Sequence, residues 1–353
     1  MILIYMEEPS VLTDVFSYRY LKVPIWNEYS VIEQRLLNQL IGITKDVLPL
    51  FTPKGVKNEA TDNAWKEIHN KVSRELGVSE LFNRYYSYTT KGIPVSGFHS
   101  WEYVCEKFVT APFDGKQSPD SFIKERINII ELAMRTRYEQ LISISSNLSP
   151  NVNALLGLSK GLTVPTSNKN EPFDFNQHIN KNYSDSVYEM NERFRRSGVP
   201  LTLHNGFIQI SKDELTESTI AKPFWDILAD PIWRNVDIDM KEALDRRDSN
   251  AKDPVIFASK ALESTIKIIS EKKGWTTGSE KGASNFIDNL NSKANGRFIE
   301  PWEAELLKGF FIHIRNKISH GPGSKPMPSM TDEQTNWAIE TAMSWIKTLV
   351  SRM

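Results

Sequence analysis

The sequence predicts a mainly helical protein that ends in a helical bundle and contains one small β-hairpin. Three observations support this prediction. Apolar residues recur at helical spacing in most of the long segments. One Asn-Gly pair stands between two short runs of alternating apolar residues, which is typical of a hairpin. The last hundred residues carry clear start and stop signals for several helices.

Length and composition are those of a globular protein with more than one domain. The 353 residues are enough for two or three domains, and the contents of 40% hydrophobic and 25% charged residues are ordinary. The formal charge of −1 indicates no overall preference for nucleic acid. Residues 251–353 hold 14 Lys and Arg against 11 Asp and Glu, a net of +3. That bias permits RNA binding without demonstrating it.

The sequence predicts a cytoplasmic protein with no membrane partner. Cys105 is the single cysteine and cannot form an internal disulfide, which fits a reducing compartment. The apolar opening, Met1–Met6, is short and lacks the basic flank and cleavage site of a signal peptide. No run of about 18 apolar residues is present that could span a membrane.

We expect residues 1–145 to form a helical domain with a sensing or regulatory role. Apolar residues at helical spacing predict helices over Val31–Leu40, Trp65–Leu76 and Phe122–Ile142. Residues bearing Pro and Gly, such as Lys91–Pro94, separate them. Residues 146–176 are expected to be a loop or linker, because Ser, Asn, Gly and Pro dominate there.

A bridging segment is expected over residues 177–250. It begins with a polar helix, Gln177–Arg195, and continues into the predicted hairpin, Leu201–Ile210. Asn205-Gly206 lies at its centre and favours a type I′ turn, which needs positive φ at both positions.

Residues 251–353 predict an up-down bundle of four helices. Asp253 is a candidate N-cap for a first helix that begins at Pro254 and continues until Gly274. Its inner face should carry Val255, Ala258, Leu262, Ile266 and Ile269. A shorter helix follows over Ser284–Leu290. The third helix should run from Pro301 to His320, where Gly and Pro stop it. Thr331–Gln334 has the pattern of a capping box for the fourth.

The third helix separates apolar from polar residues when it is drawn at about 100° per residue. Its bundle-facing stripe and its opposite, polar face each have four members: Leu307, Phe311, Ile314 and Ile318 on the first, and Gly309, His313, Asn316 and His320 on the second. Arg315 lies on the flank. Gly309 costs about 1 kcal/mol in a helix interior, so its presence suggests close approach of another backbone, such as a second copy of this helix.

These residue types suit cleavage of RNA through its own 2′-OH. Histidine can act as acid or base near neutral pH. Arginine offers a permanent fork of donors to phosphate oxygens, and Asn316 can orient the ring of His320 or a phosphate. One chain supplies only one Arg–His pair, whereas an isologous dimer would supply two.

The alternative is that this face is simply solvated. Arg and His near the C-terminus of a helix complement its dipole, and the spacing from Arg315 to His320 is a weak motif. His313 fits a surface or interface position. It lies about 10 Å along the axis from His320, too far for both to bind one metal. We expect no metal site and no cofactor, because no P-loop, zinc motif or nucleophile elbow is present.

Two stretches resemble the abortive-infection C-terminal family, a branch of the HEPN superfamily. They are Asp253–Ser264, which contains Ala261-Leu262-Glu263-Ser264, and Arg315–Gly323, which contains Arg315-Asn316 and Ser319-His320-Gly321. The resemblance covers about the last hundred residues. Phe16–Arg19, the helix from Val31 and the Asn-Gly hairpin resemble AbiJ-type N-terminal regions more weakly.

The resemblance implies a dimeric, metal-independent endoribonuclease that acts as a toxin or phage-defence effector. Arg315, Asn316 and His320 correspond to the family's catalytic pattern. Glu263 falls in the family pattern too and is a candidate for supporting those residues, although a surface ion pair with Lys267 is the simplest interpretation. Pro322 stands where HEPN toxins silenced by adenylylation carry Tyr, which disfavours a nucleotidyltransferase antitoxin.

His313, Lys317 and Lys325 are further candidates for contacting RNA or supporting the site, although solvated lysines are commoner. Trp225, Trp233 and Trp302 are expected in the core. The favoured hypothesis is an RNA-cleaving effector, with tRNA as one candidate substrate. It would dimerise through the polar face of the helix 301–320 and answer to an unknown inhibitor or trigger. The alternatives are a silent HEPN scaffold that binds RNA or protein, and a structural dimerisation module.

Overall fold

The computed structural model describes residues 14–52, 54–147, 175–211, 216–249, 251–316 and 330–353. The chain divides into two compact units, residues 1–208 and 209–353. Each unit is largely helical, and the predicted class of a mainly helical protein is confirmed. The finer division into segments 1–145, 146–176, 177–250 and 251–353 stays a prediction.

Four long helices make the body of the first unit: α2 (Val31–Val47), α3 (Glu59–Glu75), α5 (Pro119–Asn147) and α7 (Phe175–Arg196). α2 packs against α5 and α7, and α3 packs against α5 and the short α4 (Trp101–Val109). α2 begins at a capping box in which Ser30 and Glu33 exchange hydrogen bonds. The four predicted helices of this region are therefore present, although α2 ends seven residues later and α3 begins six residues earlier than expected.

The predicted Asn-Gly hairpin is confirmed as β3 (Leu201–His204) and β4 (Phe207–Ile210). Its two turn residues have positive φ, 46° at Asn205 and 83° at Gly206, as a type I′ turn requires. Every residue of β3 is buried, and so are the last three of β4. The hairpin is therefore part of the packed interior.

A buried charge cluster seats this hairpin on α5. Glu131 is fully buried and accepts hydrogen bonds from Arg19 of α1 (Phe16–Arg19), at 3.0 and 2.5 Å, and from Arg135 at 2.6 Å. Its carboxylate also accepts the backbone N–H of Ile208 at 3.0 Å. Arg135 stacks on the ring of Phe207, with its guanidinium carbon 3.8 Å from the ring centre. Three segments far apart in sequence thus meet at one carboxylate.

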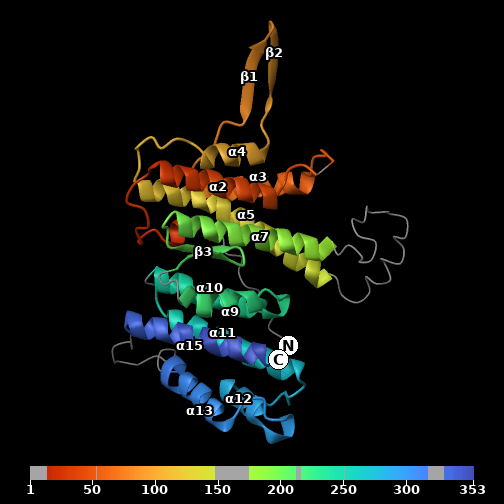
Figure 1. Cartoon of the computed structure of the whole chain (residues 1–353), viewed down its shortest axis with the longest axis vertical. Helices are drawn as coiled ribbons and strands as arrows, with labels where there is room; N and C mark the ends of the chain where they lie inside the picture. Colours follow the sequence, from red (N-terminus) through yellow and green to blue (C-terminus); the bar gives the residue numbers. More distant parts are fainter. Residues whose placement is uncertain (1–13, 53, 148–174, 212–215, 250, 317–329) are drawn as a thin grey trace, which may run out of the picture. The chain divides into compact units, whose positions relative to one another are not determined.

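A second hairpin was not predicted. β1 (Tyr85–Thr90) and β2 (Ile93–Phe98) pair antiparallel, with Tyr85 opposite Phe98 and Thr90 opposite Ile93. The expected break at Lys91–Pro94 is its turn, where Lys91 and Gly92 have φ of 51° and 77°. Figure 1 shows this ribbon extending beyond α3 and α4 of the first unit, with no third strand beside it.

The second unit is a bundle of longer helices with short turns between them. The long members are α10 (Arg234–Asp248), α11 (Pro254–Lys272), α12 (Ala283–Asn291), α13 (Pro301–Phe310) and α15 (Asp332–Ser351). The short ones are η1 (Glu217–Ala221), α9 (Lys222–Ile227), η2 (Pro231–Trp233), η3 (Lys293–Asn295) and η4 (Phe311–Arg315). α11 is central, because it packs against α10, α12, α15 and η4.

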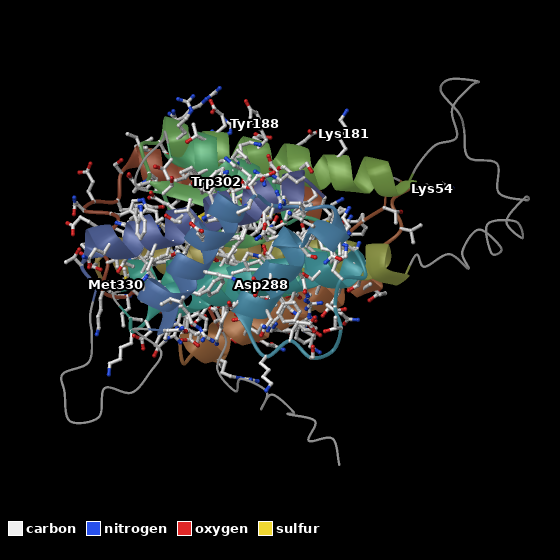
Figure 2. The ribbon with its side chains drawn as sticks, turned by 90° about the horizontal axis from the view of Figure 1, so that it is seen from below. Lys54, Lys181, Tyr188, Asp288, Trp302 and Met330 are labelled. Atoms are coloured by element: carbon white, nitrogen blue, oxygen red, sulfur yellow. The ribbon has the colours of Figure 1, made fainter. Side chains whose placement is uncertain are left out.

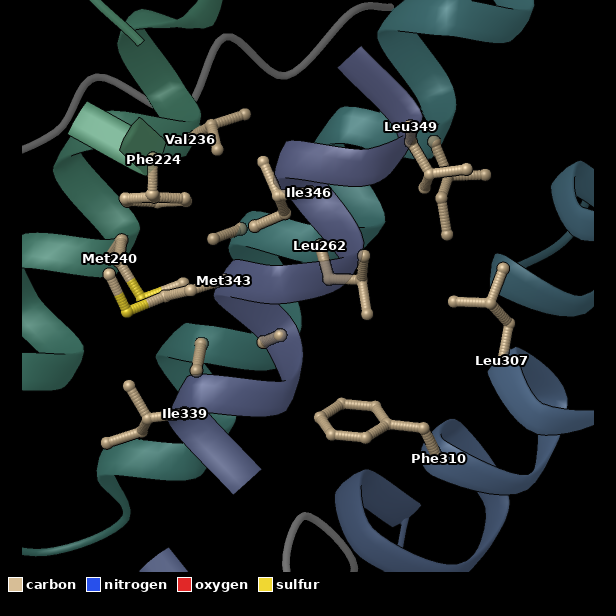
Figure 3. Packing of buried hydrophobic residues seen from close by; sticks show 14 of the residues in the cluster. Phe224, Val236, Met240, Leu262, Leu307, Phe310, Ile339, Met343, Ile346 and Leu349 are labelled. Carbon is tan, nitrogen blue, oxygen red and sulfur yellow. The ribbon is translucent and has the colours of Figure 1, made fainter. Parts of the chain in front are cut away.

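One continuous apolar core holds the second unit together. Figure 3 shows Leu262 of α11 on the side that faces Leu307 and Phe310 of α13, and Ile346 of α15 on the side that faces Phe224 of α9. The five residues expected on the inner face of α11 are all buried: Val255, Ala258, Leu262, Ile266 and Ile269. The predicted capping box at Thr331 is confirmed. Asp253 does precede α11, but it adopts the left-handed conformation (φ 60°) and its side chain caps nothing.

Among the described residues, no helix is both long and apolar enough to cross a membrane.

Candidate functional site

The helix expected to carry the functional residues begins where the sequence predicted, at Pro301. Glu303, one turn in, accepts the backbone N–H of Glu300 at 2.9 Å. It also accepts two hydrogen bonds from Arg352 at the end of α15, at 2.7 and 3.0 Å. These bonds from Arg352 hold the pKa of the Glu303 carboxyl below its ordinary value. This clamp fixes the start of α13 to α15, and the sequence analysis missed it.

The winding of this helix changes at the turn that contains Arg315. α13 ends at Phe310, and Phe311–Arg315 form the π-helical turn η4, whose hydrogen bonds span one more residue than those of an α-helix. The expectation of regular α-helical winding from Pro301 to His320 is therefore wrong across these five residues. Such turns occur frequently at functional sites, because they rotate the side chains that follow.

The inner face of the helix is largely as expected. Leu307 is fully buried, and Phe311 is 6% exposed. Ile314 is half-buried and packs against the edge of the core. Ile318, the fourth residue expected there, lies outside the described residues. The buried side thus places Arg315 and Asn316 at the border between core and solvent.

The outer face is less polar than predicted. Trp302, labelled in Figure 2, is 60% exposed, so its assignment to the core is wrong, whereas Trp225 and Trp233 are buried as expected. Leu306 and Ile312 on the same helix are 56% and 55% exposed. The spacing of four residues from Trp302 to Leu306 could have revealed this apolar stripe, because both fall on the face that also carries Gly309 and His313.

Gly309 has open space beside it within the chain. A Cβ atom built there would have the Cδ2 of His313, at 4.0 Å, as its nearest neighbour among the described residues. Close approach by the backbone of the described residues therefore does not explain this glycine. The approach of a second copy of this helix to Gly309 remains a prediction.

Arg315 and Asn316 lie together on this helix. The guanidinium of Arg315 donates to Oδ1 of Asn316 at 3.1 Å. Its other terminal nitrogen lies 3.8 Å from Oε2 of Glu263 on α11. The side chain of Arg315 is 38% exposed, so the guanidinium is held from one side and reaches solvent on the other. A partly exposed guanidinium with donors to spare can bind a phosphate.

Glu263 joins α11 to the site. Its Oε1 lies 2.8 Å from Nζ of Lys267, which confirms the expected i, i+4 ion pair. Because its side chain is 17% exposed and Lys267 is 41% exposed, the pair is a partly buried one. The carboxylate thus stands between two cations, Lys267 and Arg315. The sequence pattern placed Glu263 near the site, and the structure brings it to Arg315.

The other candidates are divided between the exposed surface and the part of the chain that is not described. His313 is exposed on η4. His320, Lys317 and Lys325 lie outside the described residues, as do Gly321 and Pro322. The structure therefore brings together Arg315, Asn316 and Glu263.

Among the residues that the structure describes, no three His, Cys, Asp or Glu side chains cluster so that they could hold a metal ion.

Two family models match the chain, and together they cover most of it. The model described as AbiJ N-terminal domain 4 matches residues 14–226. The model described as a HEPN-like domain matches residues 234–352. No curated protein and no solved structure matches the chain. The second match includes α10, one helix more than the sequence analysis assigned to the C-terminal bundle.

Proposed function

The chain belongs to the AbiJ N-terminal domain 4 family and ends in a HEPN-like domain, and on this premise we propose that it is a metal-independent endoribonuclease. The two matches support an abortive-infection effector of the HEPN type. The proposal adds the chemical activity and the residues that carry it. Arg315, Asn316 and His320 would cleave RNA by attack of its own 2′-OH.

The observation that carries the proposal is the setting of Arg315. Its guanidinium is anchored by Asn316 at 3.1 Å and faces Glu263 at 3.8 Å, yet 38% of its side chain stays exposed. An arginine that served only the fold would be expected to spend its donors on buried partners, as Arg19 does on Glu131. Here the fixed positive charge stands at the edge of the bundle, where a phosphodiester can reach it.

Each residue has a role that its chemistry allows. The guanidinium of Arg315 stabilises the negative charge that grows on the phosphate oxygens in the transition state. His320, five residues later in the chain, exchanges protons with the 2′-OH or with the leaving 5′ oxygen. Asn316 accepts a hydrogen bond from the guanidinium of Arg315 and thereby positions it. Glu263 limits the directions that Arg315 can take, without withdrawing it from solvent.

A dimer through the outer face of the helix 301–320 would complete the site. That face carries exposed Trp302, Leu306 and Ile312, with Gly309 open beside His313. Large exposed apolar side chains on one helix face are typical of interfaces. A two-fold axis there would bring two Arg–His pairs together. We therefore propose that the dimer interface is a mixed apolar and polar surface, in place of the polar surface that the sequence predicted.

The same apolar stripe favours the second candidate, a non-catalytic HEPN module that dimerises and binds RNA or protein. That module needs the dimer but not the chemistry. The two candidates therefore differ in whether RNA is cut, and in whether Arg315 and His320 are needed for cutting.

Cleavage of a tRNA pool by the purified chain in excess EDTA tests the proposal. We expect cut products that carry 2′,3′-cyclic phosphate ends, because the 2′-OH is the nucleophile. Arg315→Ala should lower the rate by about a hundredfold to a thousandfold, as loss of a charge-stabilising donor does. Loss of an acid–base group in His320→Ala should cost about the same or more.

Arg234→Ala is the matched control, because Arg234 is exposed at the start of α10 in the same unit. It should cleave at the wild-type rate. Bound but uncut RNA would contradict the nuclease and favour the non-catalytic module. Cleavage that survives both Arg315→Ala and His320→Ala would also contradict the proposal, because the activity would then come from elsewhere.

A further inference from the structure

The β1–β2 ribbon of the first unit exposes an unusual number of large side chains. Tyr85, Tyr88, Ile93 and Phe98 are between 50% and 66% exposed. A two-stranded hairpin is only marginally stable by itself, and this one pairs with no third strand among the described residues. Exposed large apolar side chains on a projecting element are typical of a binding surface.

One face of the ribbon carries an aromatic ladder, which we define as Tyr86, Tyr88, His99 and Tyr103. The ring centres of Tyr86 and Tyr88 are 6.0 Å apart and nearly parallel, with 25° between their planes. Tyr86 lies 4.7 Å from His99, and His99 stacks on Tyr103 at 4.2 Å. The rings thus run as a series from α4 out along the ribbon.

Gly97 allows the ladder to form. It pairs with Tyr86 across the two strands, and a Cβ built at Gly97 would lie 2.6 Å from the hydroxyl oxygen and 2.9 Å from Cζ of Tyr86. The ring therefore lies flat across the glycine. A tyrosine in that position turns one face of its ring away from the strand, and this is the surface on which a base can stack.

The ribbon itself, residues 85–98, carries one charged side chain, the cation Lys91. Between residues 81 and 101 there is no Asp or Glu, while Arg84 and Lys91 are present. Lys107 lies over the ring of Tyr103, with Nζ 5.2 Å from its centre. Arg84 is packed on Trp101 at 4.1 Å and joins the base of the ribbon to α4. Glu80 and Glu102 lie just outside this stretch, and Glu102 is paired with Lys45 at 3.4 Å. Rings in series on a ribbon that carries a cation and no carboxylate fit a ligand that has both flat bases and negative phosphates.

We propose that the aromatic ladder binds single-stranded RNA, stacking bases on Tyr86 and Tyr88 while Lys91 contacts a phosphate. The inference names an RNA-recognition element for the nuclease proposed above, and it rests on that function. Stacking on tyrosine is tolerant of sequence, because every base has a flat face. Thr90, which lies on the same face of β1 as Tyr86 and Tyr88, can add a hydrogen bond to sugar or phosphate.

The experiment measures binding of a fluorescent oligonucleotide of 2′-O-methyl RNA to the full chain, by anisotropy. The methyl group removes the attacking hydroxyl, so binding is read without cleavage. We expect Tyr86→Leu with Tyr88→Leu to weaken binding by about tenfold or more, because leucine keeps an apolar surface and loses the stacking ring. Tyr88→Trp should bind at least as tightly as the wild type.

Tyr188→Leu is the matched control, because Tyr188 of α7 is 70% exposed and lies outside the ribbon (Figure 2). Its affinity should equal that of the wild type. Lys91→Gln should reduce the slope of log affinity against log salt by about 0.7, the value for one phosphate contact on a single strand. If the double variant does not fold, Tyr88→Leu carries the test alone, since Tyr88 is 55% exposed.

Affinity unchanged by both the Tyr86/Tyr88 and the Lys91 substitutions would overturn the inference, and would be the outcome if the ribbon serves a protein partner. Absence of binding by the wild type would overturn it too. The nuclease proposal is judged separately. If the chain cleaves tRNA but its ladder does not bind RNA, the nuclease proposal is supported and the ladder proposal is contradicted. If binding depends on the ladder but the chain never cuts RNA, the nuclease proposal is contradicted and the proposal of RNA binding by the ladder is supported.

Discussion

The two β-hairpins, β1–β2 and β3–β4, have strands of six and four residues and opposite surroundings. β3–β4 is buried along most of both strands, and its turn lies against α5. β1–β2 exposes most of its side chains, and no described strand covers either edge. The first hairpin holds a charge cluster and the second holds a series of rings. The comparison indicates that one ribbon serves the fold and the other is free to serve binding.

The difference lies in what each turn contacts. A Cβ at Gly206, in the buried hairpin, would lie 2.7 Å from the backbone Cα of Arg135. A Cβ at Gly92, in the exposed one, would meet nothing within 4 Å. Both glycines have positive φ, 83° and 77°. The two glycines therefore have similar backbone conformations, and they differ in their tertiary contacts.

The largest effect is expected for Glu131→Gln. The substitution removes the buried negative charge shared by Arg19 and Arg135, whose side chains are 7% and 14% exposed, and leaves them only the half-exposed carboxylate of Asp14 among these charges. Breaking a buried ion cluster on one side costs about 3–5 kcal/mol in the free energy of unfolding. Urea denaturation measures it, and Glu106→Gln in the half-exposed pair with Lys45 is the control, with an expected cost below about 1 kcal/mol. Equal losses in the two variants would mean that the charge cluster does not seat the hairpin.

The paired substitutions Gly206→Ala and Gly92→Ala separate contact from backbone strain. Gly206→Ala should destabilise the first unit by about 2–4 kcal/mol, because the methyl group collides with backbone as well as straining φ. Gly92→Ala adds the strain alone, about 1 kcal/mol, and confines it to the exposed ribbon. Thermal unfolding followed by circular dichroism reports the difference. A Gly92→Ala variant that melts as early as Gly206→Ala would show that β1–β2 is part of the same packed interior.

The smallest effect is a pH dependence at Asp14. Burial alone would raise the pKa of this carboxyl, but the charges of Arg19 and Arg135 and a hydrogen bond from Arg19 outweigh it and hold the pKa below its ordinary value. Because the folded pKa is lowered, the stabilisation is complete above the unfolded pKa and disappears as the pH falls through the folded one. With the side chain 48% exposed, Asp14→Asn should cost about 0.5 kcal/mol at pH 7. The difference in Tm between wild type and variant should shrink as the pH falls through the lowered pKa, and vanish once the carboxyl is protonated in the folded state. A difference that persists there would exclude the charge as its cause.

Local signals predicted much of this fold. The Asn-Gly pair identified β3–β4, because its turn chemistry is local. Helix periodicity identified α2, α3, α5, α7 and the four bundle helices after residue 251. β1–β2 was missed because Pro94 and Gly97 weaken a strand pattern and Lys91-Gly92 is a less recognised turn pair than Asn-Gly. The contacts of Glu131 could not be predicted, because its partners are distant in the sequence.

The candidate site was predicted less completely. Residue types and family pattern selected Arg315, Asn316 and Glu263, and the structure brings these three together. A helical wheel assumes constant winding, so it could not foresee the π turn at Phe311–Arg315. The wheel does place Trp302 on the outer face with Gly309 and His313, and its assignment to the core went wrong because it rested on the apolar residues near it in the sequence.

The composite nuclease is tested most directly by mixing two inactive variants. Arg315→Ala and His320→Ala are co-expressed in equal amounts, and cleavage of tRNA in EDTA is measured for each alone and for the mixture. If each site takes its arginine from one chain and its histidine from the other, half of the dimers regain one of two sites, and about a quarter of wild-type activity returns. Dimers that form as freely as the wild type but recover no activity would contradict the composite site.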